Sequence, residues 1–187
     1  YLVPHGFFYS THALKKHDAP PTFFFQMPYW RFFGALSQRL ERITTAFVDT
    51  WIDADTIVLD PNAGLPDRDD RDVCEVLYHA LMANRVEFMV ADTDIIAAAT
   101  VQNGALQCRD LNIRRILVPP MRAPEPEWLE TAARLRLQGI ECRDIASRDD
   151  ALAAAAAAAQ ASPSSLPFTV VAGDCAKIWM TARRQGA

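Results

Sequence analysis

The sequence predicts an α/β protein with a mostly parallel sheet, helices on both of its faces and an extended N-terminal arm. Apolar runs of four or five residues, rich in Val and Ile, alternate along the chain with longer segments of helical periodicity. Asp, Asn or Pro precedes several of these helical segments, and Gly139 follows one, as helix caps and stops do. Alternation of this kind is typical of parallel sheets, whose crossover connections place helices on the faces.

The predicted elements follow from these patterns. Strands are expected at residues 56–59, 86–90, 115–118, 140–143 and 168–172, and helices at 70–83, 93–107, 125–137, 149–160 and 175–184. An earlier amphipathic helix starts near Tyr29, because Trp30, Phe33, Leu36 and Leu40 recur at steps of three and four residues. An Ala/Ser/Pro-rich stretch at about 153–166 is expected to be a surface insertion.

Length and composition predict the domain organisation. The chain has 187 residues, half of them hydrophobic, which suits one globular domain with an extension and excludes disorder of the whole chain. Residues 1–28 contain Gly6 and four prolines without any period and are expected to form an extended arm, followed by a single α/β domain at 29–187. No apolar run approaches the roughly 18 residues of a membrane-spanning helix, so a membrane partner is not expected. The first residue is Tyr1 rather than Met, which favours a removed targeting segment or a longer chain.

Basic and aromatic residues gather in the first quarter of the chain. Residues 1–48 hold five Lys or Arg against two acids, a charge of +3, whereas the rest carries −7. The same segment holds eight of the ten Phe residues. A binding partner is therefore expected at the N-terminal segment rather than at the acidic remainder.

Carboxylates follow the predicted strands at the edge where parallel sheets bind ligands. Such oxygen ligands can hold Mg²⁺, and the segments 57–62 and 97–110 resemble the PIN family of metal-dependent nucleases. Asp is also a common N-cap after a strand, and this second interpretation is favoured. The alternative of a PIN-like nuclease has the candidate metal ligands Asp60, Asp92, Asp94 and Asp110.

Other catalytic and cofactor sites find little support. Neither GxGxxG nor GxxxxGK[ST] occurs, which argues against dinucleotide and P-loop sites. The four cysteines lack CxxC spacing and favour buried, reduced thiols over zinc or disulfides. His79, the only His after residue 48, has no clear nucleophile beside it, so a catalytic triad is not expected. These absences favour a binding or structural protein without a cofactor.

Two N-terminal segments carry a family resemblance. His5-Gly6-Phe7-Phe8-Tyr9-Ser10, a basic and proline-containing spacer, and the segment Met27–Leu40 resemble the large-subunit ribosomal protein four family. In that family an aromatic, glycine-containing turn leads through a basic segment to a helix with Arg and Ala-Leu-Ser, and then to a strand ending in Asp, here Ile57–Asp60. Four later segments resemble the strands and helices that follow in the family: Ile116–Pro119, Trp128–Leu135, Ile140–Asp144 and Leu166–Val171.

The resemblance implies a structural component of the large ribosomal subunit. It implies that the arm binds ribosomal RNA and that the acidic domain contacts other ribosomal proteins, with no enzymatic activity, cofactor or small-molecule substrate. A mitochondrial form, bound to ribosomes in the matrix, is expected from the acidic balance and the missing Met.

Lys and Arg would contact phosphates, and aromatic side chains would stack on bases. The RNA-contacting residues expected are His5, Gly6, Tyr9, Lys15, Lys16, His17, Tyr29, Arg31, Arg39 and Arg42. A further alternative is a non-catalytic subunit of another organellar complex, with the Phe-rich arm as a strap that docks on protein.

Overall fold

The chain divides into two compact units. The computed structural model describes residues 6, 10, 12, 22, 24–64, 66–161 and 183–185. Unit 1 comprises residues 1–50 and 185–187, and unit 2 comprises residues 51–184. The sequence analysis sets a boundary after residue 28, whereas the helix that follows Tyr29 belongs to unit 1.

Unit 1 contains the amphipathic helix predicted near Tyr29. It begins as the 3-10 helix η2 (Pro28–Phe32) and continues as the α-helix α1 (Phe33–Ala46). Pro28 suits the first position of a helix, where a missing N–H costs nothing. Next along the chain, strand β1 (Thr50–Ile52) pairs with β9 (Arg183–Gln185).

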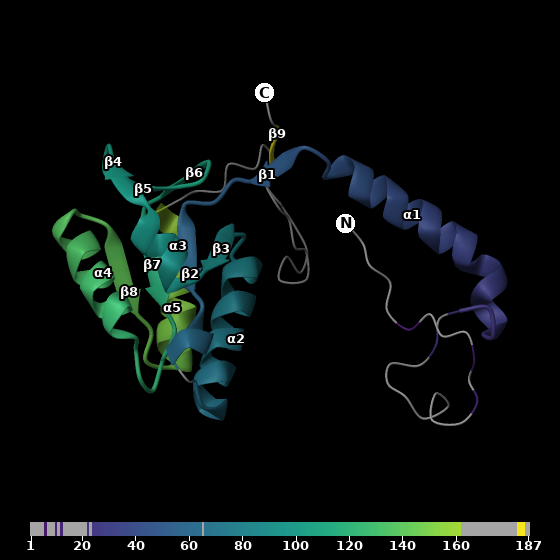
Figure 1. The fold of residues 1–187 in the computed structure, drawn as a ribbon, viewed down its shortest axis with the longest axis horizontal. Coiled ribbons are helices and arrows are strands. Elements are labelled where there is room, and N and C mark those ends of the chain that lie inside the picture. The colour runs from purple at the N-terminus through teal and green to yellow at the C-terminus, as the bar shows by residue number, and fades with distance from the viewer. Residues whose placement is uncertain are drawn as a thin grey trace. The chain divides into compact units, whose positions relative to one another are not determined.

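Unit 2 is built on a four-stranded parallel sheet, as the sequence predicts (Figure 1). Its strands, in chain order, are β2 (Thr56–Leu59), β3 (Phe88–Ala91), β7 (Arg115–Val118) and β8 (Glu141–Asp144). Across the sheet the order is β3-β2-β7-β8, and the register places Val58 beside Val90, Ile57 beside Ile116 and Ile116 beside Cys142. The strand expected at 168–172 lies outside the described residues.

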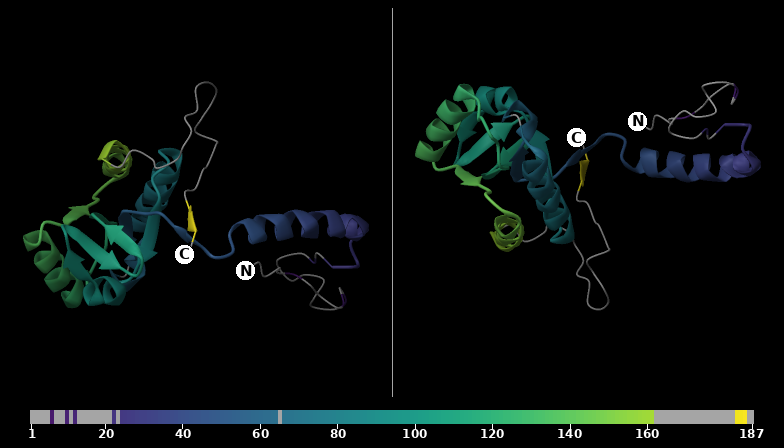
Figure 2. Two further views of the ribbon diagram at one scale, coloured as in Figure 1. Left: turned by 90° about the horizontal axis from the view of Figure 1, so that it is seen from above. Right: turned by 90° about the horizontal axis from the view of Figure 1, so that it is seen from below.

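Helices cover both faces of this sheet, which confirms the predicted layers (Figures 1 and 2). On one face α2 (Arg68–Ala83) packs against α5 (Arg148–Ala161). On the other face α3 (Thr93–Ala98) packs against α4 (Pro126–Leu137). A capping box begins α2, in which Asp67 and Asp70 each accept the other's backbone N–H.

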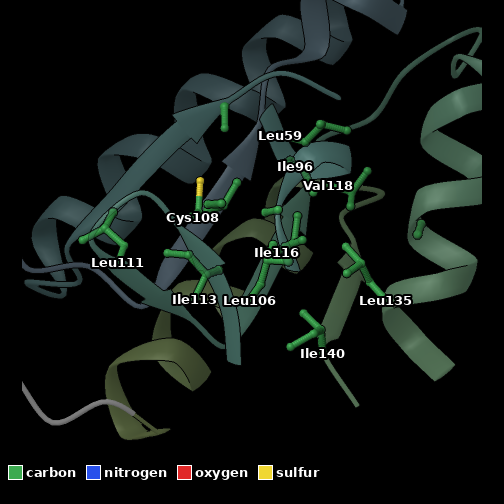
Figure 3. Close-up of a cluster of buried hydrophobic side chains, with 14 of the residues drawn as sticks. Leu59, Ile96, Leu106, Cys108, Leu111, Ile113, Ile116, Val118, Leu135 and Ile140 are labelled. Atoms are coloured by element: carbon green, nitrogen blue, oxygen red, sulfur yellow. The ribbon is translucent and has the colours of Figure 1, made fainter. Parts of the chain in front are cut away.

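Each face has its own apolar cluster, because alternate residues of β2 and β7 point to opposite sides. Ile57, Leu59, Ile116 and Val118 pack with residues of α3 and α4, and Figure 3 shows part of this cluster. Val58 and Leu117 pack with residues of α2 and α5. A sheet buried on both faces explains why these strands read as continuous apolar runs.

The helix expected at 93–107 is wrong beyond Ala98. After α3 the chain forms an antiparallel sheet of β4 (Thr100–Gln102), β5 (Ala105–Cys108) and β6 (Leu111–Ile113). Asn103 and Gly104 both have positive φ, +52° and +74°, the conformation of a two-residue hairpin turn that a helix cannot contain. Leu106, Leu111 and Ile113 from this sheet are buried in the cluster beneath α3 and α4.

The Ala-rich stretch differs from the surface insertion that the sequence suggests. Helix α5 runs on to Ala161, and Ala154, Ala155 and Ala158 are buried against the face that α2 covers. Small side chains let the two helices approach closely. Of the helix expected at 175–184, residues 183 and 184 are instead in β9, and 175–182 lie outside the described residues.

Among the residues that the structure describes, no helix has both the length and the apolar character needed to cross a membrane.

Candidate functional site

Thr22 organises the turn that leads into η2. Its side chain is buried, and its hydroxyl accepts a hydrogen bond from the backbone N–H of Phe24 at 3.2 Å. The Tyr29 hydroxyl donates to the Thr22 carbonyl at 3.4 Å. The Met27 N–H donates to the Phe24 carbonyl at 3.0 Å, which closes the turn. Tyr29 is therefore fixed partly by the turn itself.

Aromatic rings form a chain at the start of α1. The rings of Phe24 and Trp30 meet edge to face with centroids 5.1 Å apart, and Trp30 stacks on Phe33 at 4.7 Å. Such pairs are favoured beyond the area they bury. These ring pairs join the turn after Thr22 to the first residue of α1.

One side of α1 is apolar and largely exposed. We define the α1 face as Phe32, Leu36, Leu40 and Ile43, which fall on one side of the helix at the usual three- and four-residue spacing. Phe32, Leu36 and Ile43 are 61%, 49% and 45% exposed, and Leu40 is half-buried. Helix α1 has no buried residue. No described element buries the α1 face.

Arginines lie beside and behind this apolar stripe. Arg31, Arg39 and Arg42 are exposed, and in the parts of the chain that the structure describes no ion pair engages any of them. The Arg31 guanidinium lies 4.7 Å above the Phe32 ring. Helical spacing puts Arg39 next to Ile43 at the margin of the α1 face and Arg42 nearer the opposite side. An acidic rim on a partner would complement Arg39.

The structure describes half of the residues expected to contact RNA. Gly6 is buried with φ of +93°, and Tyr29, Arg31, Arg39 and Arg42 are exposed on or next to η2 and α1. The other expected contacts, His5, Tyr9, Lys15, Lys16 and His17, lie outside the described residues.

The crevice between the carboxyl ends of β2 and β7 is filled by the chain itself, and a hollow of about 470 Å³ lies beside the end of β2, lined in part by Asp60, Asn62 and Arg71. In an open α/β sheet the usual ligand site lies at the carboxyl ends of neighbouring strands from which the chain turns in opposite directions, here β2 and β7. After β2, the 3-10 helix η3 (Pro61–Gly64) packs so close to Met121 that a Cβ at Gly64 would lie 2.5 Å from the Met121 Cβ. The Ala123 N–H donates to the Gly64 carbonyl at 3.1 Å, and Arg122 pairs with Asp67 at 2.9 Å.

The candidate metal ligands have separate local environments. Asp92 caps α3 by accepting the Ile95 N–H at 2.9 Å, which confirms the interpretation as a cap at this position. Asp60 accepts hydrogen bonds from the backbone and side chain of Asn62 at 3.0 and 2.8 Å. Asp94 is exposed in the first turn of α3, and Asp110 is exposed between β5 and β6. Within the described ranges, no three His, Cys, Asp or Glu residues are placed to hold a metal ion.

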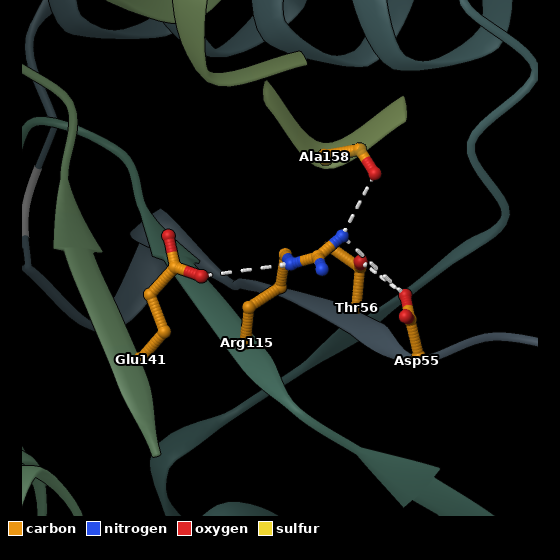
Figure 4. Close-up of polar contacts among 5 residues, drawn as sticks. All are labelled: Asp55, Thr56, Arg115, Glu141 and Ala158. Carbon is orange, nitrogen blue, oxygen red and sulfur yellow. Dashed lines mark hydrogen bonds and ion pairs between the residues drawn. The ribbon is translucent and has the colours of Figure 1, made fainter. Parts of the chain in front are cut away.

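Arg115 forms a buried polar cluster at the amino end of the sheet (Figure 4). Its guanidinium donates to the Ala158 carbonyl at 3.1 Å and lies 3.7 Å from the carboxylates of Asp55 and Glu141. The cluster joins β7, β8, the start of β2 and the end of α5. One guanidinium charge faces two carboxylates, and its contacts link these four elements.

The described cysteines are poorly suited to nucleophilic chemistry. Cys74, Cys108 and Cys142 are free thiols, and Cys175 lies outside the described residues. Burial raises the pKa of Cys74 and Cys108, and raises the pKa of Cys142 to about 11. These thiols are protonated near neutral pH, and the reactive form is the thiolate.

A groove of about 520 Å³ runs between α2 and α5. Arg148 and Asp72 on its rim lie 4.0 Å apart, and His79 pairs with Glu75 at 3.7 Å along α2. His79 is thus a surface residue of α2 with an acidic neighbour on the same helix, and the groove brings no nucleophile to it.

Comparison of the sequence with protein-family models gives no match, and comparison with curated proteins gives no significant match.

Sequence reasoning missed the α1 face as a site. The periodicity predicts an amphipathic helix, but it identifies an apolar side without showing what covers it. Two features of the sequence could have distinguished a docking helix from a core helix. These are the arginines of the helix and the aromatic segment before it.

Proposed function

We propose that the chain is a non-catalytic component of a larger assembly and that the α1 face is its docking surface. The observation that carries this proposal is the exposure of Phe32, Leu36 and Ile43 along one side of a helix. Contiguous exposed apolar residues rimmed by polar ones are typical of protein interaction sites.

Burial of the α1 face on docking contributes several kcal/mol to the free energy of binding, about 1.5–3 kcal/mol for each large apolar side chain. Leu36 and Ile43 lie two turns apart on one side of α1, and an amphipathic helix presenting such anchors fits an apolar groove on a protein partner. Arg39, at the margin, favours a groove with acidic residues along its rim.

The large ribosomal subunit is the second candidate, and the exposed arginines favour it. Arg31, Arg39 and Arg42 are free of ion pairs to described residues, as phosphate-binding residues need to be. This candidate keeps the RNA contacts and the mitochondrial location that the family resemblance implies. The ribosomal candidate accounts for the exposed arginines. An apolar groove with an acidic rim on a protein partner accounts for Arg39 and also for the exposed Leu36 and Ile43.

Sedimentation of variants tests the docking surface. The tagged chain is expressed in its source cells, and gentle lysates are run on density gradients. We expect the unmodified chain to sediment in a particle, and Leu36→Glu/Ile43→Glu to remain near the top because two charges cannot enter an apolar groove. The matched control Gln38→Glu/Thr45→Glu adds the same charges on the opposite side of α1 and leaves sedimentation unchanged. An unmodified chain that runs as a free monomer contradicts the proposal.

Salt and nuclease separate the two candidates. An apolar protein groove keeps the chain in its particle at roughly 0.5 M salt, where exposed phosphate contacts are strongly screened, and after ribonuclease treatment. Comigration with large-subunit RNA, with release by ribonuclease, supports the ribosomal candidate instead. If the ribosomal candidate holds, the Arg39→Gln/Arg42→Gln variant no longer sediments with the particle. If the chain docks on a protein groove, the same variant binds the particle more weakly but still sediments with it.

A further inference from the structure

Strand β8 lies at one edge of the parallel sheet and packs against α4 (Figure 1). The Glu141 N–H donates to the Arg114 carbonyl at 3.2 Å, so the peptide groups of Glu141 and Arg143 face β7. In a parallel ladder alternate residues turn the other way, so the N–H and C=O groups of Cys142 and Asp144 point away from β7. No described strand pairs with this outer side of β8.

A side chain of α4 occupies one of these outward groups. Arg136, in the last turn of α4, donates from Nε and Nη2 to the Cys142 carbonyl at 3.3 and 3.2 Å. Its Nη2 also donates to the Asp144 carboxylate at 2.9 Å, which holds the guanidinium at the edge of the sheet. Hydrogen bonds from a charged donor are stronger than those between neutral groups. An incoming strand must therefore displace Arg136 to reach the Cys142 carbonyl.

The position of the two acceptors explains why α4 can supply this contact. Cys142 packs on the apolar cluster that α4 covers, and Asp144, two residues further on, shares that face of the sheet. Both lie beside the last turn of α4, and Arg136 is the residue of that turn that bonds to them. The arginine thus bridges a helix and the free edge of a strand rather than two residues of the core.

The sequence of β8 is otherwise suited to pairing with β8 of a second copy. Outward peptide groups meet outward ones in an antiparallel pair, so a two-fold axis at Cys142 gives an allowed register. In that register Glu141 of one copy lies opposite Arg143 of the other, and opposite charges at opposed positions stabilise a strand pair. The two central hydrogen bonds join the Cys142 N–H of each copy to the Cys142 carbonyl of the other. That carbonyl is the group that Arg136 occupies.

We propose that Arg136 is an autoinhibitory contact that keeps β8 from pairing with β8 of a second copy. Natural proteins protect exposed strand edges with charged side chains. Here the charged side chain acts by occupying the hydrogen-bond acceptor that self-pairing requires. The contact belongs to the edge of unit 2, so this proposal is independent of the docking function of α1.

Sedimentation velocity on the full chain tests the contact. Every variant is made in the parent Leu36→Glu/Ile43→Glu, so that association through the α1 face does not contribute. We expect the average mass of Arg136→Leu to approach twice that of the parent as the concentration rises to about 100 μM, as for a weak dimer. The matched control Arg68→Leu makes the same replacement at an exposed arginine of α2 and leaves the mass unchanged.

Two second-site variants identify the associating surface. The Cys142 N–H points away from β7, so Cys142→Pro removes hydrogen bonds of the self-pair and none between β8 and β7. Arg143→Glu instead places two acids opposite each other in the proposed register. Each change, added to Arg136→Leu, should return the mass to that of the parent.

Two results overturn the proposal. The first is an Arg136→Leu chain that associates no more than the parent. The second is association of Arg136→Leu that persists with Arg143→Glu, which indicates another surface or another register. Near-ultraviolet circular dichroism verifies that each variant is folded, and Arg143→Glu decides the outcome if the proline variant is not.

Discussion

Gly64 marks the place where the chain fills the crevice between the carboxyl ends of β2 and β7. A Cβ there would lie 2.5 Å from the Cβ and Sδ of Met121, closer than van der Waals contact allows. We expect Gly64→Ala to lower the free energy of unfolding by about 1–3 kcal/mol, because η3 or the Met121 segment must shift. Urea denaturation measures the change. In a Met121→Gly background, which removes the Cβ, Cγ and Sδ, the cost of Gly64→Ala should shrink, and an equal cost in both backgrounds contradicts this packing.

Arg85 holds a backbone conformation that favours glycine. It follows α2 with φ of +59°, and its Nε is buried with no hydrogen-bond partner among the described residues. We expect Arg85→Gly to raise the free energy of unfolding by about 0.5–1 kcal/mol, since glycine adopts this region without a Cβ clash. Thermal unfolding monitors the change.

The neighbouring residue provides the contrast. Asn84 has φ of −85°, and its side-chain amide donates to the Ala80 carbonyl at 2.8 Å. Asn84→Gly therefore gains no relief of strain and loses a hydrogen bond, with an expected cost of about 1 kcal/mol. Stabilisation by both glycine substitutions would contradict the assignment of strain to Arg85.

At the scale of the element, the stability that the N-cap of α2 contributes should depend on pH. The Asp70 backbone N–H, and then Arg122, lower the pKa of Asp67 below its ordinary value of 3.8. The unfolded chain therefore takes up this proton first, so the stabilisation is complete above the unfolded pKa and is lost as pH falls through the folded pKa. Asn is as good an N-cap as Asp, so Asp67→Asn removes the charge and keeps the cap.

Urea denaturation at a series of pH values tests whether the stabilisation by Asp67 decreases as the pH falls. The unmodified chain should be more stable than Asp67→Asn near neutral pH, and the difference should decrease as pH falls from about 5 to about 2. A difference that is constant over that range contradicts the role of the charge. Arg122→Met, which removes the ion pair, should lessen the same pH dependence.

Elements with a strong period were predictable, and those set by a turn or by packing were not. Residues 56–59 and 115–118 are strands with the predicted bounds, because both of their faces are buried. The hairpin at 100–108 was missed because apolar residues fit both periods there, and the Asn103-Gly104 turn decided the outcome. The alanines of α5 have too little side chain to reveal a buried face, yet Ala155 is fully buried.

The sequence predicted the arginines of the candidate site but not its exposed apolar residues. Charge and aromatic content identified the N-terminal segment as the region of interest, and Arg31, Arg39 and Arg42 are indeed exposed. The exposure of Leu36 and Ile43 depends on tertiary packing, since the same period describes a helix in a core and a helix awaiting a partner. The filled crevice between β2 and β7 was likewise unpredictable, because η3 and Met121 meet only in the folded chain.

The molecule combines unit 2, which has two apolar clusters, with unit 1, in whose described residues no such cluster forms. The buried residues of both apolar clusters lie within residues 54–158 of unit 2, whereas helix α1 of unit 1 buries no residue. The charges follow the same division, with +3 in the first 48 residues and −7 in the remainder. Stability and docking are therefore expected to be separable properties of the chain.

A chain of residues 51–184 should consequently fold without unit 1. Its two clusters cover both faces of the sheet, and Trp128 is buried in one of them as a fluorescent reporter. We expect a cooperative urea transition with a free energy of unfolding of about 5–15 kcal/mol, and a free monomer on the density gradient because the α1 face is missing. Gradual loss of the fluorescence of Trp51, Trp128 and Trp179 without a cooperative transition would show that the folding of unit 2 depends on unit 1. Cooperative folding with retention in the particle would instead place the docking surface on unit 2, so this one truncation tests both stability and docking.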